Sequence, residues 1–165
     1  MLIAQPAGSA AFPRRNWAVS TDGLQIGEVA LTGWGVGTIM LRGESYSTMS
    51  AQAISYSLPR EYHMRHHEDV VHLAREEIDF VYSIDNDRFT LRQALFWKSF
   101  GRSWPGFRFY RQDDRVPVGS IVQERALRDD VAVNLPIEIT ETLQLFLLWL
   151  VVDRAQWRSS FDNPA

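Results

Sequence analysis

The stretch TETLQLFLLWLVVDRAQWR, residues 140–158, decides the fold of this chain. It contains no glycine or proline, and Leu143–Val152 holds one polar residue, Gln144, among large apolar side chains. Acidic residues precede the apolar run and arginines follow it, which is the charge order that a helix dipole favours. Thr140 is a suitable N-cap. We therefore predict a helix over about residues 139–158 that is apolar nearly all round.

A helix that is hydrophobic on every face must be buried on every face or lie in lipid. Crossing a membrane takes about 20 apolar residues, and this run has roughly half that number before Asp153 interrupts it. We therefore expect no transmembrane span and a helix enclosed by protein. A β-barrel closed around the helix meets this requirement, because its strands hide their edges in one another and its lumen receives the helix.

The sequence before the helix is typical of short antiparallel strands with turn residues between them. Apolar and polar residues alternate in Ala53–Leu58, Ile78–Ile84, Phe89–Trp97, Trp104–Tyr110 and Val116–Gln123. Asp85–Asp87 predicts a turn between two of these strands. The glycine-rich segment Thr32–Gly37 matches no phosphate-binding motif and predicts a bend between strands. Strands and helices do not alternate along the chain, so a Rossmann-type sheet is not expected.

The length of 165 residues fits one domain. Residues 1–15 are small, apolar and interrupted by proline and glycine, which predicts a flexible N-terminal arm. We expect the barrel to occupy residues 16–158 and a tail to follow over 159–165. The N-terminus lacks the basic and apolar regions of a signal peptide, so we expect a cytoplasmic location.

The composition excludes several classes of site. The chain has no cysteine, so disulfide scaffolds, thiolate zinc sites and cysteine nucleophiles are ruled out. Its formal net charge is −3, so no strong field attracts nucleic acid, and we do not expect nucleic acid as a partner. Lys98 is the one lysine, and arginine supplies the other basic side chains. This skew fits a compositional bias better than a site for anions.

The order of elements resembles the tubby C-terminal-like superfamily, which includes the tubby domain, the phospholipid scramblases and the LURP-one-related proteins. The features that carry the resemblance are the hairpins over Val71–Leu95, the segment Val116–Ile121 with its valine-glycine pair, and Asn134–Pro136 before the apolar helix. The match covers most of Leu24–Trp157, in order rather than in identity. The resemblance implies a mainly β fold (α+β) in which a closed antiparallel barrel of about twelve strands wraps around a hydrophobic C-terminal helix.

The chain also departs from the best-known members of that superfamily. It lacks the cysteine-rich palmitoylated segment and the calcium-binding stretch of scramblases, and it has no motif onto which the phosphoinositide-binding residues of tubby domains can be carried. It looks most like the bacterial members that have no assigned activity. We therefore predict a non-enzymatic binding or scaffold domain that is cytoplasmic or peripheral to a membrane, and monomeric or dimeric. Its outer surface would contact phospholipid headgroups or a protein partner.

One basic and aromatic region offers candidate binding residues. Arg92, Lys98, Arg102 and Arg108 lie close in sequence and are interleaved with phenylalanine and tryptophan. Such a mixture can bind lipid headgroups or nucleic acid. Strand alternation gives a simpler interpretation, in which the aromatic side chains face the lumen and the basic ones face water.

The four histidines lie within ten residues and supply the candidates for metal ligands, His63, His66 and His67. The segment has no HExxH order, and a closed zinc site needs three or four ligands fixed in geometry. We therefore predict a polar connection between strands and no metal site.

The sequence gives no catalytic residue and no cofactor. Its adjacent acid pairs, such as Glu76-Glu77, would point to opposite faces of a strand, and no GxSxG motif is present. An alternative remains: a small-molecule-binding barrel or an enzyme with an open, lipocalin-like lumen. That alternative requires the C-terminal helix to pack outside the barrel with one polar face.

Overall fold

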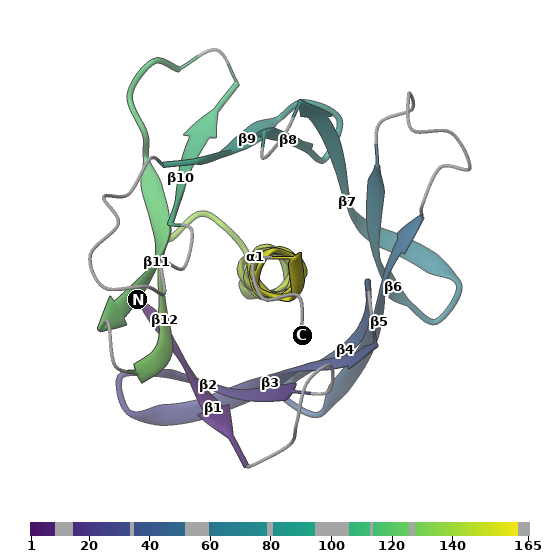
Figure 1. The fold of residues 1–165 in the computed structure, drawn as a ribbon, viewed down its shortest axis with the longest axis vertical. Helices are drawn as coiled ribbons and strands as arrows, with labels where there is room; N and C mark the ends of the chain where they lie inside the picture. Colours follow the sequence, from purple (N-terminus) through teal and green to yellow (C-terminus); the bar gives the residue numbers. More distant parts are fainter. Residues whose placement is uncertain are drawn as a thin grey trace.

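A computed structural model describes residues 1–8, 15–33, 35–51, 60–78, 81–94, 106–112, 114–125 and 128–161. These residues form one closed barrel of twelve antiparallel strands around a single helix (Figure 1). The strands are β1 (Leu2–Ala7), β2 (Arg15–Thr21), β3 (Leu24–Gly33), β4 (Val36–Leu41), β5 (Glu44–Ala51), β6 (Glu61–His66), β7 (Asp69–Ile78), β8 (Val81–Ile84), β9 (Phe89–Gln93), β10 (Phe107–Arg111), β11 (Gly119–Arg125) and β12 (Arg128–Asn134). The helix is α1 (Glu141–Phe161). The predicted fold class is confirmed.

Each strand pairs with its neighbours in sequence, and β1 closes the barrel by pairing with both β2 and β12. The flexible arm expected over residues 1–15 is therefore wrong for Leu2–Ala7. Leu2 and Ala4 are buried in the core, and the backbone of β1 satisfies two strand edges that would otherwise be open. Pro6 is tolerated because it lies near the end of the strand, opposite Trp17.

α1 occupies the lumen of the barrel (Figure 1). Every side chain from Leu145 to Val152 is at most 1% exposed, so the helix is buried on all faces as predicted. The cap is the predicted one, because the Leu143 amide donates to Thr140 Oγ1 at 3.3 Å. The helix ends at Phe161, three residues beyond the expected 158. The open-lumen alternative requires this helix outside, and the structure places it inside.

The strand and turn predictions hold in most of the described chain. Asp85, Asn86 and Asp87 form the predicted turn with φ between 48° and 66°, and the glycine-rich corner is a bend between β3 and β4. The strand expected from Val116 begins only at Gly119. The strand expected over Ala53–Leu58 lies outside the described residues.

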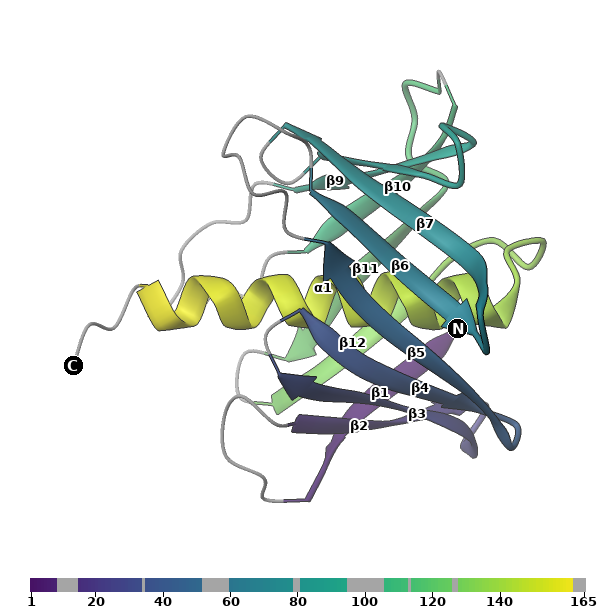
Figure 2. The same cartoon turned by 90° about the vertical axis from the view of Figure 1, so that its right-hand side faces the viewer.

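The barrel has two different ends, which Figure 2 shows side-on. We call the end where α1 begins the mouth; it carries the turns between β2 and β3, β4 and β5, β6 and β7, and β8 and β9, and the loops over 114–118 and 135–140. We call the opposite end the base. Within the described part of the chain, no helix is long and apolar enough to cross a membrane.

Candidate functional site

Two of the predicted binding residues come together on the outer wall of the barrel. Arg92 on β9 and Arg108 on β10 are direct cross-strand partners, and both are exposed. The same row continues with Ser120 on β11, opposite Arg108, and Asn134 on β12, opposite Ser120. The guanidinium of Arg92 lies 4.9 Å from the ring centroid of Tyr110, which holds it against the wall. The row therefore presents two cations, a hydroxyl and an amide to solvent.

The electrostatics of this row favour an anion. Like charges directly opposite each other on a sheet repel, so an unoccupied Arg92–Arg108 pair is unfavourable. No described acidic side chain forms an ion pair with either arginine. A phosphate or carboxylate between them would relieve the repulsion and accept bonds from both guanidinium groups. The other two candidates, Lys98 and Arg102, lie outside the described residues.

The histidine segment is not the predicted connection between strands, because His63 and His66 lie on β6 and only His67 is in the turn to β7. The His66 ring contacts Tyr46 at 4.9 Å and His67 at 4.4 Å between ring centroids, tilted to both. His63 Nε2 lies 3.5 Å from a carboxylate oxygen of Glu61. Among the residues that the structure describes, no three histidine or acidic side chains are grouped so that they could hold a metal ion.

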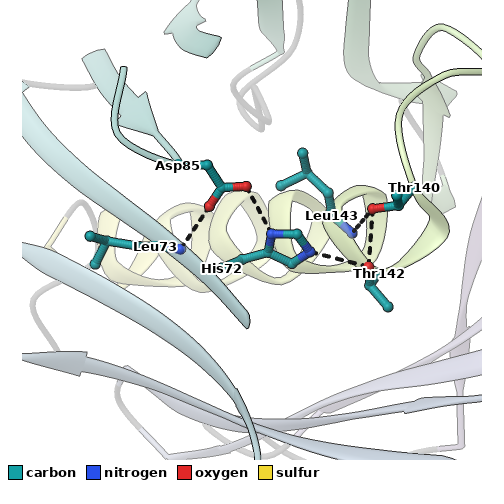
Figure 3. Close-up of polar contacts among 6 residues, drawn as sticks. All are labelled: His72, Leu73, Asp85, Thr140, Thr142 and Leu143. Carbon is teal, nitrogen blue, oxygen red and sulfur yellow. Dashed lines mark hydrogen bonds and ion pairs between the residues drawn. The ribbon is translucent and has the colours of Figure 1, made fainter. Parts of the chain in front are cut away.

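A polar chain inside the mouth was not predicted from the sequence (Figure 3). His72 Nδ1 lies 2.8 Å from Asp85 Oδ2, and His72 Nε2 lies 3.1 Å from the Thr142 hydroxyl on α1. The Leu73 amide donates to Asp85 Oδ1 at 3.0 Å. Burial opposes ionisation of Asp85, but the hydrogen bonds from His72 and Leu73 outweigh it and hold the pKa of this carboxyl below its ordinary value.

Asp85, His72 and Thr142 follow the order carboxylate, imidazole and hydroxyl, in which a base activates a nucleophile in some enzymes. Here the Thr142 hydroxyl lies 3.0 Å from that of Thr140, which caps the helix. Both nitrogens of His72 thus have partners within the protein, and its ring stacks on Phe146 at 6.0 Å. The chain joins β7, the turn after β8 and the first turn of α1, so it positions the helix in the mouth. Its members are far apart in sequence, and no motif marks them.

A second buried polar cluster fixes the other half of the helix near the base. Arg154 Nη2 donates to Glu76 Oε1 at 2.5 Å, and Arg154 Nε donates to the Tyr82 hydroxyl at 2.8 Å. The Tyr62 hydroxyl donates to Glu76 Oε2 at 3.3 Å. Burial raises the pKa of both tyrosines well above the ordinary value, so both hydroxyl groups remain protonated. The cluster neutralises a charge on the helix with one on β7.

Comparisons with known proteins do not identify a binding site, so the candidate site is chosen from the structure. The chain matches no protein-family model, no curated protein and no solved structure. Of the three polar sites described, the two inside the barrel are closed by their own partners. The row around Arg92 and Arg108 is open to solvent, and it is the candidate binding site.

Asp153 gives the interior a pH dependence that can be measured. It is buried near the base and accepts a hydrogen bond from the Gly35 amide at 3.0 Å, and its second carboxylate oxygen has no hydrogen-bond partner among the described residues. Burial raises its pKa from 3.8 to about 6, against the opposing effects of the Gly35 amide and Arg154. The folded state therefore binds this proton more tightly than the unfolded state. Above about pH 6 the carboxyl group is ionised in the folded state and lowers the free energy of unfolding. This loss of stability disappears below about pH 4, where the group is protonated in both states.

Replacing Asp153 by asparagine should therefore stabilise the protein at neutral pH. The side-chain oxygen of asparagine still accepts from Gly35, and the buried charge is removed. A pKa difference of about two units corresponds to about 2–3 kcal/mol at pH 7. Urea unfolding of Asp153→Asn and the unsubstituted chain at pH 7 and pH 4 measures this gain, which should shrink toward zero at the lower pH. A variant that is less stable at pH 7 would contradict the assignment.

Proposed function

We propose that this protein is a non-enzymatic binding domain of tubby-like type whose outer wall binds an anionic phospholipid headgroup through Arg92 and Arg108. The observation that carries the proposal is their direct opposition on neighbouring strands without an acidic partner among the described residues. In this proposal the protein is cytoplasmic and attaches to the membrane peripherally.

The chemistry of the row supports a phosphorylated headgroup. Arginine donates two parallel hydrogen bonds to phosphate oxygens, and Ser120 and Asn134 add uncharged donors next to Arg108 in the same row. A basic residue near an anionic membrane contributes about 1 kcal/mol, so two such residues give weak, salt-sensitive attachment. A scaffold role is favoured over catalysis because α1 fills the lumen, where a barrel enzyme would hold its substrate.

Vesicle flotation tests the proposal. The chain should float with vesicles of phosphatidylcholine that contain phosphatidylserine or a phosphoinositide, and not with phosphatidylcholine alone. Arg92→Gln combined with Arg108→Gln should weaken binding by roughly 10- to 30-fold, as expected from the loss of two basic contacts.

The matched control removes the same charge elsewhere. Arg75 and Arg115 are exposed arginines outside the row, so Arg75→Gln with Arg115→Gln lowers the net charge equally. This control should bind nearly as well as the unsubstituted chain. Equal losses in the two double variants would show nonspecific attraction, and no flotation at low salt would remove the proposal.

A further inference from the structure

The largest exposed apolar side chains gather at the mouth of the barrel. Ile137 is 100% exposed and Val116 is 72% exposed, more than any other large apolar residue described. The other exposed apolar residues at this end are Met1, Leu24, Met40, Val70 and Val71. Turn tips ordinarily carry polar residues, glycine or proline, so apolar tips at one end call for a reason.

The loops that carry Val116 and Ile137 lie side by side and are held in place. Arg111, at the end of β10, forms an ion pair with Glu138 in the neighbouring loop. Gly119 lies so close to Asn134 and Leu135 that a Cβ there would come within 2.8 Å of a Leu135 methyl group. Leu135 and Val118 also pack against the core. The exposed tips are therefore presented by loops with fixed bases, which lowers the entropy lost when a partner binds.

The mouth is also acidic. Its exposed acidic side chains without an ion pair in the described structure are Asp22, Glu44, Glu68, Asp69, Asp87 and Asp114. Two of its arginines, Arg42 and Arg111, already pair with Glu141 and Glu138. The remaining described arginines at this end are Arg65, opposite Val70, together with Arg88 and Arg115, which are fewer than the six acidic side chains without an ion pair. A surface with apolar tips and surplus negative charge repels an anionic membrane and attracts a basic partner.

We propose that the mouth is a docking surface for a protein partner through a segment that combines basic and large apolar side chains. The apolar tips around Val116 and Ile137 would bury apolar side chains of that segment, and the surrounding carboxylates would steer its basic ones. This surface is separate from the Arg92–Arg108 row, so a partner could bind here whether or not the outer wall binds lipid.

Selection from a random peptide library tests the docking surface without knowledge of the partner. Peptides that bind the immobilised full chain should be enriched in lysine or arginine together with large apolar residues. A selected peptide should bind at least about tenfold more weakly to Val116→Ser combined with Ile137→Ser, and its affinity should fall as salt rises. These substitutions alter exposed tips, so the fold should be unchanged by circular dichroism.

The control variant changes exposed apolar residues on the wall instead. Val36 and Met49 form an exposed cross-strand pair away from the mouth, so Val36→Ser with Met49→Ser should leave peptide binding unchanged. Enrichment of acidic peptides, no enrichment, or equal losses in both double variants would overturn the proposal. So would vesicle binding that is lost in the Val116→Ser, Ile137→Ser chain and kept in Arg92→Gln, Arg108→Gln, because the tips would then enter a membrane.

Discussion

Leu147→Asp is expected to prevent the barrel from folding. Leu147 is fully buried in the N-terminal half of α1, and strands surround this helix. The substitution removes a buried apolar side chain, worth about 2–5 kcal/mol in a core, and places a carboxyl group there without a partner. The combined loss rivals the total stability of a typical domain, about 5–15 kcal/mol. Circular dichroism and size-exclusion chromatography should show an unfolded or aggregated chain.

The control for Leu147→Asp is Leu147→Met, which conserves volume and apolar character. It should cost less than about 1.5 kcal/mol in urea unfolding and keep the strand signal in circular dichroism. A folded Leu147→Asp chain with stability near that of the methionine variant would show that α1 is not enclosed, and the account of the fold would then fail.

The helix could be predicted because its signal is local. Residues 140–158 are continuous in sequence, and burial on all faces follows from their composition alone. The role of Leu2–Ala7 was missed because the decisive partner is β12, more than a hundred residues away. Small residues and a proline are typical of an arm, and the closure of the barrel overrides that local preference.

The sequence could name candidate binding residues but could not predict which side chains meet in the fold. Arg92 and Arg108 were candidates from their basic and aromatic surroundings, but their pairing depends on the register of β9 and β10. The contact between His72 and Thr142 joins a strand to the helix across the lumen. No spacing rule relates two such positions, because their separation depends on how the helix is rotated within the barrel. The same holds for Arg154 and Glu76.

Arg154→Met is expected to destabilise the protein by about 3–5 kcal/mol. Arg154 and Glu76 form an ion pair in which each side chain is 8% exposed. Methionine fills a similar volume but leaves the Glu76 carboxylate buried without the Arg154 guanidinium, while the Tyr62 hydroxyl still donates to it. Removing one partner of a buried ion pair is strongly destabilising because the remaining charge has lost its hydration. Urea unfolding at pH 7 measures the loss.

A second substitution distinguishes this electrostatic explanation from a loss of packing. Adding Glu76→Gln to Arg154→Met removes the buried negative charge and keeps a group that the Tyr62 hydroxyl can donate to, so the double variant should regain at least half of the lost stability.

Arg75 provides the exposed comparison, because it is next to Glu76 on β7 and pairs with Glu61 at 2.9 Å in contact with solvent. Arg75→Met should change stability by less than about 1 kcal/mol. If Arg154→Met lost as little stability as Arg75→Met, the buried ion pair would not be what fixes the helix at the base. The hydrogen bond from the Gly35 amide to Asp153 would then be the described polar contact that holds the helix there.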